Sequence, residues 1–251
     1  LRKKRNAINR GVDTYWLSIP LRTQFNQTHS LQVSGGSNEF RFSLGLRYQN
    51  ENGVMKGSYR DVYGAELKVE YRIPGLHITN AVSINAMQSE NSPYGSFSTY
   101  TKLLPYESPY DLETGKVRKQ LDLKSGYSAY ENPLYDVVHT ENLDQSSYTE
   151  MTNNFMVNWN AASRVVVKGQ FSVTKKDDET LVFKDPKSAE FDKYVYEYGP
   201  TGSLVSSQKA RALEKGSLSE SRKSTLDWDA KFQASFNNNW DKHFLSATAG
   251  I

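Results

Sequence analysis

The segment Glu39-Phe40-Arg41-Phe42-Ser43-Leu44-Gly45-Leu46-Arg47-Tyr48-Gln49 decides the fold, because its apolar and polar residues alternate without a break. Successive side chains of a β-strand point to opposite faces, so this pattern predicts one apolar and one polar face. The segment exceeds the usual strand length of about 5–6 residues. It matches a tilted strand that crosses a bilayer, which needs roughly 9–11 residues. A long strand of a soluble sandwich is the alternative for this segment alone.

The same alternation predicts further strands along the chain, at residues 29–34, 63–73, 76–85, 155–159, 164–173, 226–236 and 245–251. We also expect a short strand at Trp16-Leu17-Ser18-Ile19, ended by Pro20. The basic run at residues 1–10 is interpreted as a solvated linker. The acidic run Asp177-Asp178-Glu179 is expected at a loop tip, because its adjacent carboxylates lack the alternate spacing of a calcium loop.

Composition excludes several classes of protein. The chain has 251 residues, no cysteine and a net charge of +3. Disulfides and thiolate metal sites are therefore absent, and the mixed charges do not favour nucleic acid as a partner. The sequence contains no apolar run long enough for a helical membrane span. Sixteen tyrosines suit strands and membrane interfaces. The chain begins at Leu1 and ends inside an apparent strand, which is expected for a fragment.

The connections between the predicted strands alternate in length. Short ones at residues 35–38, 73–76, 160–163 and 237–241 alternate with longer ones at 50–58, 89–150 and 175–222. An up-and-down outer-membrane barrel has short periplasmic turns and long extracellular loops, and a soluble sandwich offers no reason for the alternation. Tyr48, Tyr71, Trp159, Trp228 and Trp240 are expected near strand ends, as interfacial aromatics. The predicted fold class is therefore all-β: an antiparallel up-and-down transmembrane β-barrel, present in part, with about eight or nine strands.

Several motifs resemble a known family. Gly11-Val12-Asp13-Thr14-Tyr15-Trp16 and His29-Ser30-Leu31-Gln32-Val33-Ser34-Gly35-Gly36 are similar to the start of the barrel in SusC/RagA-type TonB-dependent transporters of Bacteroidetes. The resemblance continues through residues 48–58 and Arg60. It includes Asn91-Ser92-Pro93-Tyr94-Gly95 and Asn132-Pro133-Leu134-Tyr135, and His243 with the following strand fits a further hairpin.

The resemblance implies that residues 1–251 are part of a TonB-dependent receptor β-barrel, from which the plug domain and the C-terminal strands are absent. The implied function is TonB-dependent uptake of oligosaccharides, or of peptides, across the outer membrane of a Gram-negative, Bacteroidetes-like bacterium. Implied partners are a SusD-like surface lipoprotein, the lipid bilayer, and the TonB complex through regions outside this chain. Alternatives are a non-transporting barrel, such as an adhesin or a structural barrel, and a soluble β-rich module that binds glycans.

Two groups of residues are candidate sites. Aromatic rings in the long loop are candidates for substrate or partner binding, because they offer flat apolar faces and polar handles; packing of the loop on itself is the alternative. These are Tyr94, Phe97, Tyr100, Tyr106, Tyr110, Tyr127, Tyr130 and Tyr135. Charged residues on the polar strand faces are candidates to line the lumen, with cross-strand ion pairing as the alternative. These are Arg41, Arg47, Glu66, Lys68, Glu70, Arg72, Asp227, Asp229 and Lys231.

No catalytic or metal-binding pattern is recognised. The four histidines, His29, His77, His139 and His243, are far apart in the sequence and lack metal-ligand spacing. Neither a Ser-His-Asp set nor a phosphate-binding glycine loop is present. We therefore expect a protein that is not an enzyme and uses no cofactor and no metal.

Overall fold

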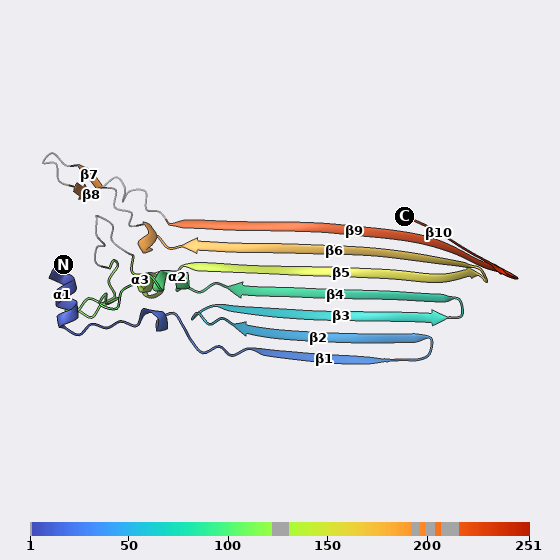
Figure 1. Ribbon diagram of the computed structural model, residues 1–251, viewed down its shortest axis with the longest axis horizontal. Helices are drawn as coiled ribbons and strands as arrows, with labels where there is room; N and C mark the ends of the chain where they lie inside the picture. Colours follow the sequence, from blue (N-terminus) through green and yellow to red (C-terminus); the bar gives the residue numbers. More distant parts are fainter. Residues whose placement is uncertain (1, 122–130, 192–195, 199–203, 207–215) are drawn as a thin grey trace.

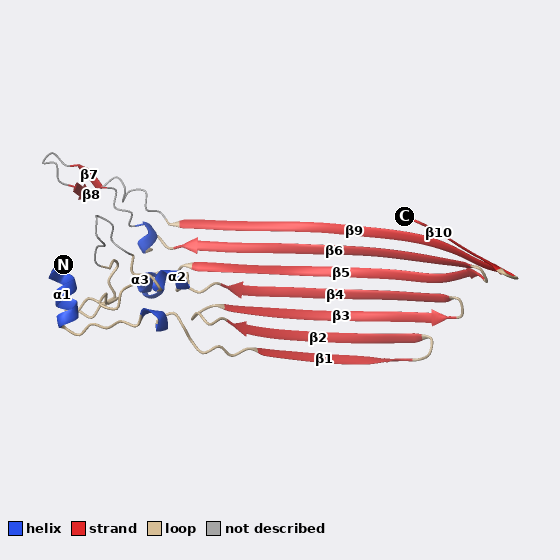
Figure 2. Ribbon diagram, in the orientation of Figure 1, coloured by secondary structure: helices blue, strands red, loops and turns tan. Residues whose placement is uncertain are grey.

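The computed structural model describes residues 2–121, 131–191, 196–198, 204–206 and 216–251. Its main feature is one antiparallel sheet of eight strands in the order β1-β2-β3-β4-β5-β6-β9-β10 (Figures 1 and 2). The strands are β1 (Gln27–Gly36), β2 (Phe40–Asn52), β3 (Tyr59–Ile73), β4 (Leu76–Glu90), β5 (Leu143–Ala162), β6 (Val165–Lys184), β9 (Ser217–Trp240) and β10 (His243–Gly250). Each strand pairs with its sequence neighbours in the sheet, so the predicted up-and-down arrangement is confirmed.

Smaller elements lie beyond one end of the sheet (Figure 1). The helices are α1 (Arg2–Asn9), α2 (Phe97–Tyr100), α3 (Pro133–His139) and two 3-10 helices, η1 (Trp16–Ser18) and η2 (Ala189–Phe191). A separate hairpin pairs β7 (Tyr196–Tyr198) with β8 (Leu204–Ser206). No helix in the described ranges is long and apolar enough to cross a membrane.

Tight turns occupy one end of the sheet and long connections the other (Figure 1). Glycines permit two of the turns. Gly36 has a φ of 139°, and a Cβ there would lie 2.1 Å from the Phe40 carbonyl oxygen. Gly75 has a φ of 79° in the turn between β3 and β4, a conformation that residues with a Cβ rarely adopt. All the long connections therefore gather on one side, together with residues 2–26.

The strand register separates two faces across the whole sheet. Directly paired residues of an antiparallel sheet share a face, as Leu44 and Leu67 do, or Arg41 and Glu70. The apolar face extends over residues 40–48, 63–73, 76–86, 151–159, 165–173 and 226–236, and only Asn80 and Asn153 interrupt it with polar amides. Each band is about 9–11 residues long, the length of a strand that crosses a bilayer.

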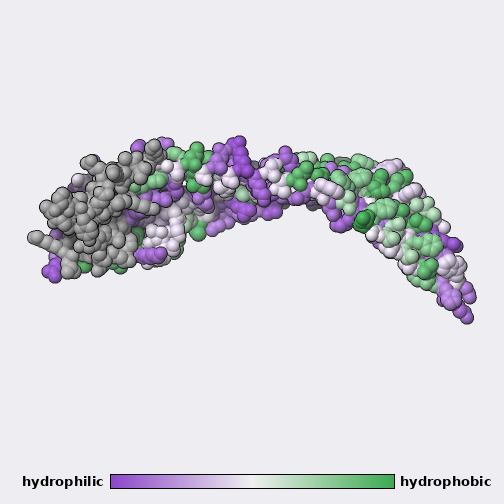
Figure 3. Space-filling view, turned by 90° about the horizontal axis from the view of Figure 1, so that it is seen from above, coloured by the Kyte–Doolittle hydropathy of each residue, from purple (hydrophilic) through white to green (hydrophobic). Residues whose placement is uncertain are grey.

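Neither face of the sheet is covered by another layer. Seen from above, the sheet is a thin, curved slab (Figure 3). Apolar side chains on it are widely open to the surroundings: Leu67 is 42% exposed, Phe232 52% and Trp228 70%. Among the described residues, the buried apolar side chains all lie outside these eight strands, at Ala7, Trp16, Tyr100, Leu121, Leu134 and Ala189. The described part of the chain is thus one open sheet rather than two packed sheets.

Several local predictions were wrong. Trp16 begins a 3-10 helix rather than a strand, because its side chain is drawn into the core of the loops. The basic run at residues 2–9 forms α1 instead of a linker. Asn238 lies within β9, and the turn follows at residues 241–242. Asp177 and its neighbours lie inside β6 rather than at a loop tip.

Asp177 lies inside a strand because β5, β6 and β9 are all longer than predicted. These strands continue beyond the apolar bands into residues 143–150, 174–184 and 217–225, where both faces are largely polar. Backbone hydrogen bonds and cross-strand pairs such as Arg222–Glu179 hold them together without an apolar face. The two longest connections are therefore shorter than predicted. Trp228 lies in the middle of β9, although it is near the outer edge of the apolar band.

Candidate functional site

The segments beyond the long-connection end of the sheet pack into one layer. This loop layer consists of residues 2–26, 53–58, 91–121, 131–142 and 185–191. Its apolar core is formed by Trp16, Tyr100 and Leu121, with Tyr94 and Leu103 packed against it. The indole Nε1 of Trp16 donates a hydrogen bond to the Leu104 carbonyl at 3.0 Å. Burial of Tyr100 raises the pKa of its hydroxyl, which donates to the Tyr94 carbonyl.

The segment before β1 is bound to the connection between β2 and β3. Arg22 donates from its guanidinium group to the carbonyls of Gly53 and Ser58, at 3.0 and 2.7 Å. The Lys56 ammonium donates to the Ile19 carbonyl at 2.7 Å. These contacts fix the 53–58 connection, which forms one wall of a cavity described below.

Asn132 joins three parts of the loop layer. Its side-chain amide donates to the carbonyls of Pro109 and Arg118, at 2.8 and 2.7 Å. Its side-chain oxygen accepts from the Leu134 N–H and caps α3. Pro133 at the first helical position suits this cap, because its fixed φ is helical and its missing N–H is not needed there. The amide is only 1% exposed, and it uses both donors and its acceptor.

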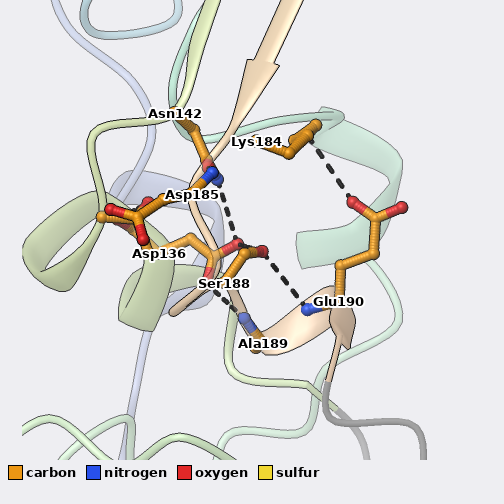
Figure 4. Close-up of polar contacts among 8 residues, drawn as sticks. Asp136, Asn142, Lys184, Asp185, Ser188, Ala189 and Glu190 are labelled. Carbon is orange, nitrogen blue, oxygen red and sulfur yellow. Dashed lines mark hydrogen bonds and ion pairs between the residues drawn. The ribbon is translucent and has the colours of Figure 1, made fainter. Parts of the chain in front are cut away.

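A second polar cluster ties α3 to the connection that follows β6 (Figure 4). We call it the loop clasp: Asp136, Asn142, Asp185, Ser188 and Ala189. The Asp136 carboxylate accepts hydrogen bonds from the Ser188 hydroxyl, the Ala189 N–H and the Asn142 amide. The Asn142 side-chain oxygen in turn accepts from the Asp185 N–H at 2.8 Å. The clasp thus joins residues 136 and 185–189, which are distant in sequence.

Asp185 itself is stabilised in its charged form. Its carboxylate accepts hydrogen bonds from the backbone N–H groups of Lys187 and Glu141, at 2.8 and 3.2 Å. These donors hold the pKa of Asp185 below the usual aspartate value, against an opposing effect of desolvation. Asp185 is only 8% exposed, so backbone N–H groups rather than water stabilise its negative charge.

A cavity of about 920 Å³ opens among these fixed segments. Four separate parts of the chain line it: residues 53–58, 91–99, 131–144 and 184–190. Tyr94 is among the lining residues, with the Lys56 ammonium 5.8 Å from the centre of its ring. Glu190 also lines the cavity, and its carboxylate is 3.7 Å from the Lys184 ammonium. The lining combines an aromatic ring, carboxylates and hydroxyls, a set able to bind hydroxyl- or amide-bearing ligands.

Three motifs singled out in the sequence meet at this cavity. The cavity lining includes Gly53, Val54, Met55 and Ser58 of the first motif. It also includes residues 91–95 of the second, and Asn132 and Pro133 of the third. The Ser92 hydroxyl donates to the Lys56 carbonyl at 2.6 Å, which holds the first two motifs together. Segments that are separate in sequence are thus neighbours in space.

The predicted loop aromatics have different surroundings. Tyr94 lines the cavity, whereas Tyr100 is 1% exposed and packs the loop core, so its ring is not available to a ligand. Phe97 and Tyr110 are exposed, and Tyr106 lines a separate cavity of about 210 Å³. Tyr135 stacks on His139 with ring centres 4.4 Å apart. Tyr127 and Tyr130 lie outside the described residues.

The predicted lumen residues share one side of the sheet. The register places all nine on the polar face: Arg41, Arg47, Glu66, Lys68, Glu70, Arg72, Asp227, Asp229 and Lys231. Lys68 and Glu70 form an ion pair at 2.6 Å, and Lys231 and Asp229 form another at 3.0 Å. These contacts run along a strand rather than across strands. No cluster of His, Asp or Glu with metal-binding geometry occurs in the described ranges.

Sequence reasoning missed Asn132 and the loop clasp as organising residues. The N-cap signal of Asn132 before Pro133 was present in the sequence. The clasp had no such signal, because its partners come from irregular segments whose proximity depends on how β5 and β6 pair.

Comparison with known protein families and with curated proteins finds no match. Solved structures with a similar fold include the RagAB peptide transporter, with a TM-score of 0.67 and 16% identity, and the RagAB peptide importer in two states. The "open-open" state gives a TM-score of 0.68 with 16% identity, and the "closed-closed" state 0.66 with 17%. Each match covers 95% of this chain and 25% of the other chain. The chain therefore has the fold of part of a SusC/RagA-type barrel.

Proposed function

We propose that this chain is part of an outer-membrane importer of the SusC/RagA type. It takes up oligosaccharides or peptides by TonB-dependent transport, together with a SusD-like surface lipoprotein. The observation that carries the proposal is the convergence of three motifs on one cavity, beyond the end of a sheet with membrane-length apolar bands. The RagAB structures are those of a peptide transporter, and this favours peptides as one substrate class.

The two faces of the sheet support the membrane placement. Exposed Leu67 and Phe232 gain free energy from contact with lipid, whereas water would leave a large apolar area unburied. The polar face, with Arg41 and Lys68, then faces the lumen. The long connections and their cavity lie on the extracellular side, where outer-membrane barrels carry their long loops.

The cavity supports substrate binding on that side. Its volume, about 920 Å³, falls within the usual range of ligand pockets. Tyr94 offers a flat ring for stacking, and the surrounding hydroxyl and carboxylate groups accept or donate hydrogen bonds to sugars or peptides. A lipoprotein lid bound to the loop layer would cover the same opening.

The test is uptake by cells that carry the full-length protein with Tyr94→Ala. Separate arms supply a defined peptide mixture and a defined oligosaccharide mixture, and binding is measured on the purified protein. Loss of one stacking ring is expected to weaken substrate binding by about 1–3 kcal/mol, by analogy with base–aromatic stacking. The matched control is Tyr15→Ala, which removes an exposed tyrosine that neither lines the cavity nor belongs to the candidate binding residues. Wild-type uptake and binding in Tyr94→Ala would contradict this role of the cavity.

A further inference from the structure

The apolar face of the sheet has a pit over Ala65. The pit has a volume of about 400 Å³ and extends across β1 to β4. Ala65 is directly paired with Leu46 on β2 and with Ile84 on β4, so both larger side chains stand beside it on the same face. Tyr63 stands two residues away along β3 and is paired with Ala86. Two small residues among large neighbours leave the space unfilled.

A row of aromatic rings closes the pit on the side of the long connections. His29 stacks on Tyr48 with ring centres 6.3 Å apart and planes at 9°. Tyr48 contacts Tyr63 at 5.1 Å. All three rings belong to directly paired positions of neighbouring strands. Aromatic rows of this kind occupy the level at which a membrane meets water.

Hydrogen-bonding groups lie beside this aromatic row, away from the pit. The Tyr48 hydroxyl donates to the Asp61 carboxylate at 3.2 Å, and the Asn50 amide donates to the same oxygen at 2.7 Å. The surface therefore changes from apolar at Leu46 and Ile84, through amphipathic rings, to polar at Asn50 and Asp61. This order matches that of a lipid molecule from acyl chain to headgroup.

We propose that the pit holds one acyl chain of a sugar-based lipid of the outer leaflet, with the sugar headgroup beside the aromatic row. The apolar walls and the size of the pit suit a chain, and the rings with their hydroxyls suit a sugar. The Asp61 carboxylate, which already accepts from the Tyr48 hydroxyl and the Asn50 amide, can also accept hydrogen bonds from sugar hydroxyls at this position. This inference rests on the membrane placement in the proposed function.

The experiment compares the lipid retained by the wild-type protein with the lipid retained by variants whose larger side chains fill the pit. Full-length protein is incubated in mixed micelles that contain equal amounts of purified lipid A and phosphatidylethanolamine, and the bound lipid is identified by native mass spectrometry. Ala65→Leu places a larger side chain between Leu46 and Ile84. The control, Ala230→Leu, makes the same change on the same face of β9, far along the sheet. Ala86→Leu is a second variant that fills the pit, and it replaces Ala65→Leu in the test if that variant does not fold.

We expect wild type and Ala230→Leu to retain one lipid A molecule, and the pit-filling variants to retain about tenfold less. Equal retention by the folded pit-filling variants and the control would overturn the inference. Preferential retention of phosphatidylethanolamine would overturn it too, because a sugar headgroup is part of the proposal. Membrane fractionation and heat-modifiable migration are recorded in parallel. A normal barrel without retained lipid contradicts only this inference, whereas a protein outside the membrane contradicts the proposed function.

Discussion

Asn132 shows how one side chain can organise an irregular region. Its amide and carbonyl groups contact Pro109 and Arg118, which lie on the two sides of one turn, and Leu134 in α3. A buried amide that satisfies its hydrogen bonds stabilises a fold modestly, but removal of it leaves its former partners unsatisfied. The order of residues 105–121 therefore depends on a residue outside that range.

Asn132→Ala is expected to loosen the loop layer. The change removes the α3 cap, at a cost of about 0.5–2 kcal/mol. It also removes one hydrogen bond to each of the Pro109 and Arg118 carbonyls, at about 0.5–1.5 kcal/mol per bond, although Pro109 keeps its bond from the Arg118 N–H. Hydrogen exchange of residues 105–121 and 131–139 would measure the effect. Asn132→Asp is the control that keeps the cap but loses the donors. An unchanged exchange rate in both variants would contradict the bridging role.

Asp185 gives the loop clasp a dependence on pH. Hydrogen bonds from Lys187 and Glu141 lower the pKa of Asp185 in the folded protein. The pKa of an aspartate in the unfolded chain is about 3.9. Because the pKa of Asp185 in the folded protein is lower, its charged carboxylate stabilises the folded state above pH 3.9. That stabilisation is lost as the pH falls through the pKa of the folded protein. Pepsin cleavage after β6, measured relative to cleavage of an unfolded reference peptide at the same pH, should therefore accelerate as the pH falls from 5 toward 2. Asp185→Asn should reduce that acceleration, and a pH profile identical to wild type would exclude Asp185 as its source.

At the scale of elements, the sequence predicted the faces better than the lengths. Alternation from Phe40 to Tyr48 reports a strand with one apolar face, and the register confirms it. Alternation fails where both faces are polar, as in residues 174–184, although backbone pairing continues there. Trp16 was misplaced because its burial depends on Tyr100 and Leu121, which are distant in sequence. The local sequence pattern thus predicts which strand face is apolar. Strand lengths and the position of Trp16 depend on contacts between residues that are distant in sequence.

Asn80 and Asn153 form a polar pair on the apolar face. The Asn80 amide donates to the Asn153 side-chain oxygen at 3.2 Å, between β4 and β5. In a lipid environment either amide alone is costly, since lipid offers it no partner.

Asn80→Val alone should destabilise the full-length protein by about 0.6 to 1.7 kcal/mol, the average and the maximum measured for side-chain hydrogen bonds in a membrane protein. Replacement of both residues by Val should recover most of that loss, because no amide remains unpaired. A double-mutant cycle of unfolding in urea with lipid vesicles would measure this. A double variant less stable than the sum of the single changes would contradict the pairing.

At the scale of the whole molecule, the two ends of the sheet differ in kind. One end has only short turns, and the other carries the loop layer with its core, clasp and cavity (Figure 1). The division follows from an up-and-down order in which every second connection is long. The sequence predicted this division from connection lengths alone. It did not predict the cavity, because the four segments that line it are brought together only by the packing of the loop layer.

This asymmetry leads to a prediction of orientation. Gly115 lies in a turn with a φ of 69° and no atom within 4 Å of its Cβ position, so an insertion there meets open space. An epitope tag after Gly115 should be detected by antibody on intact cells, because the proposed function puts the loop layer outside. A tag after Asp241, in the turn between β9 and β10, should be detected only after the outer membrane is permeabilised. Both tagged proteins must show wild-type heat-modifiable migration, so that exposure is compared between folded barrels.

Detection of the Asp241 tag on intact cells, with the Gly115 tag hidden, would reverse the orientation. The cavity would then open toward the periplasm, where it could not receive a substrate from outside.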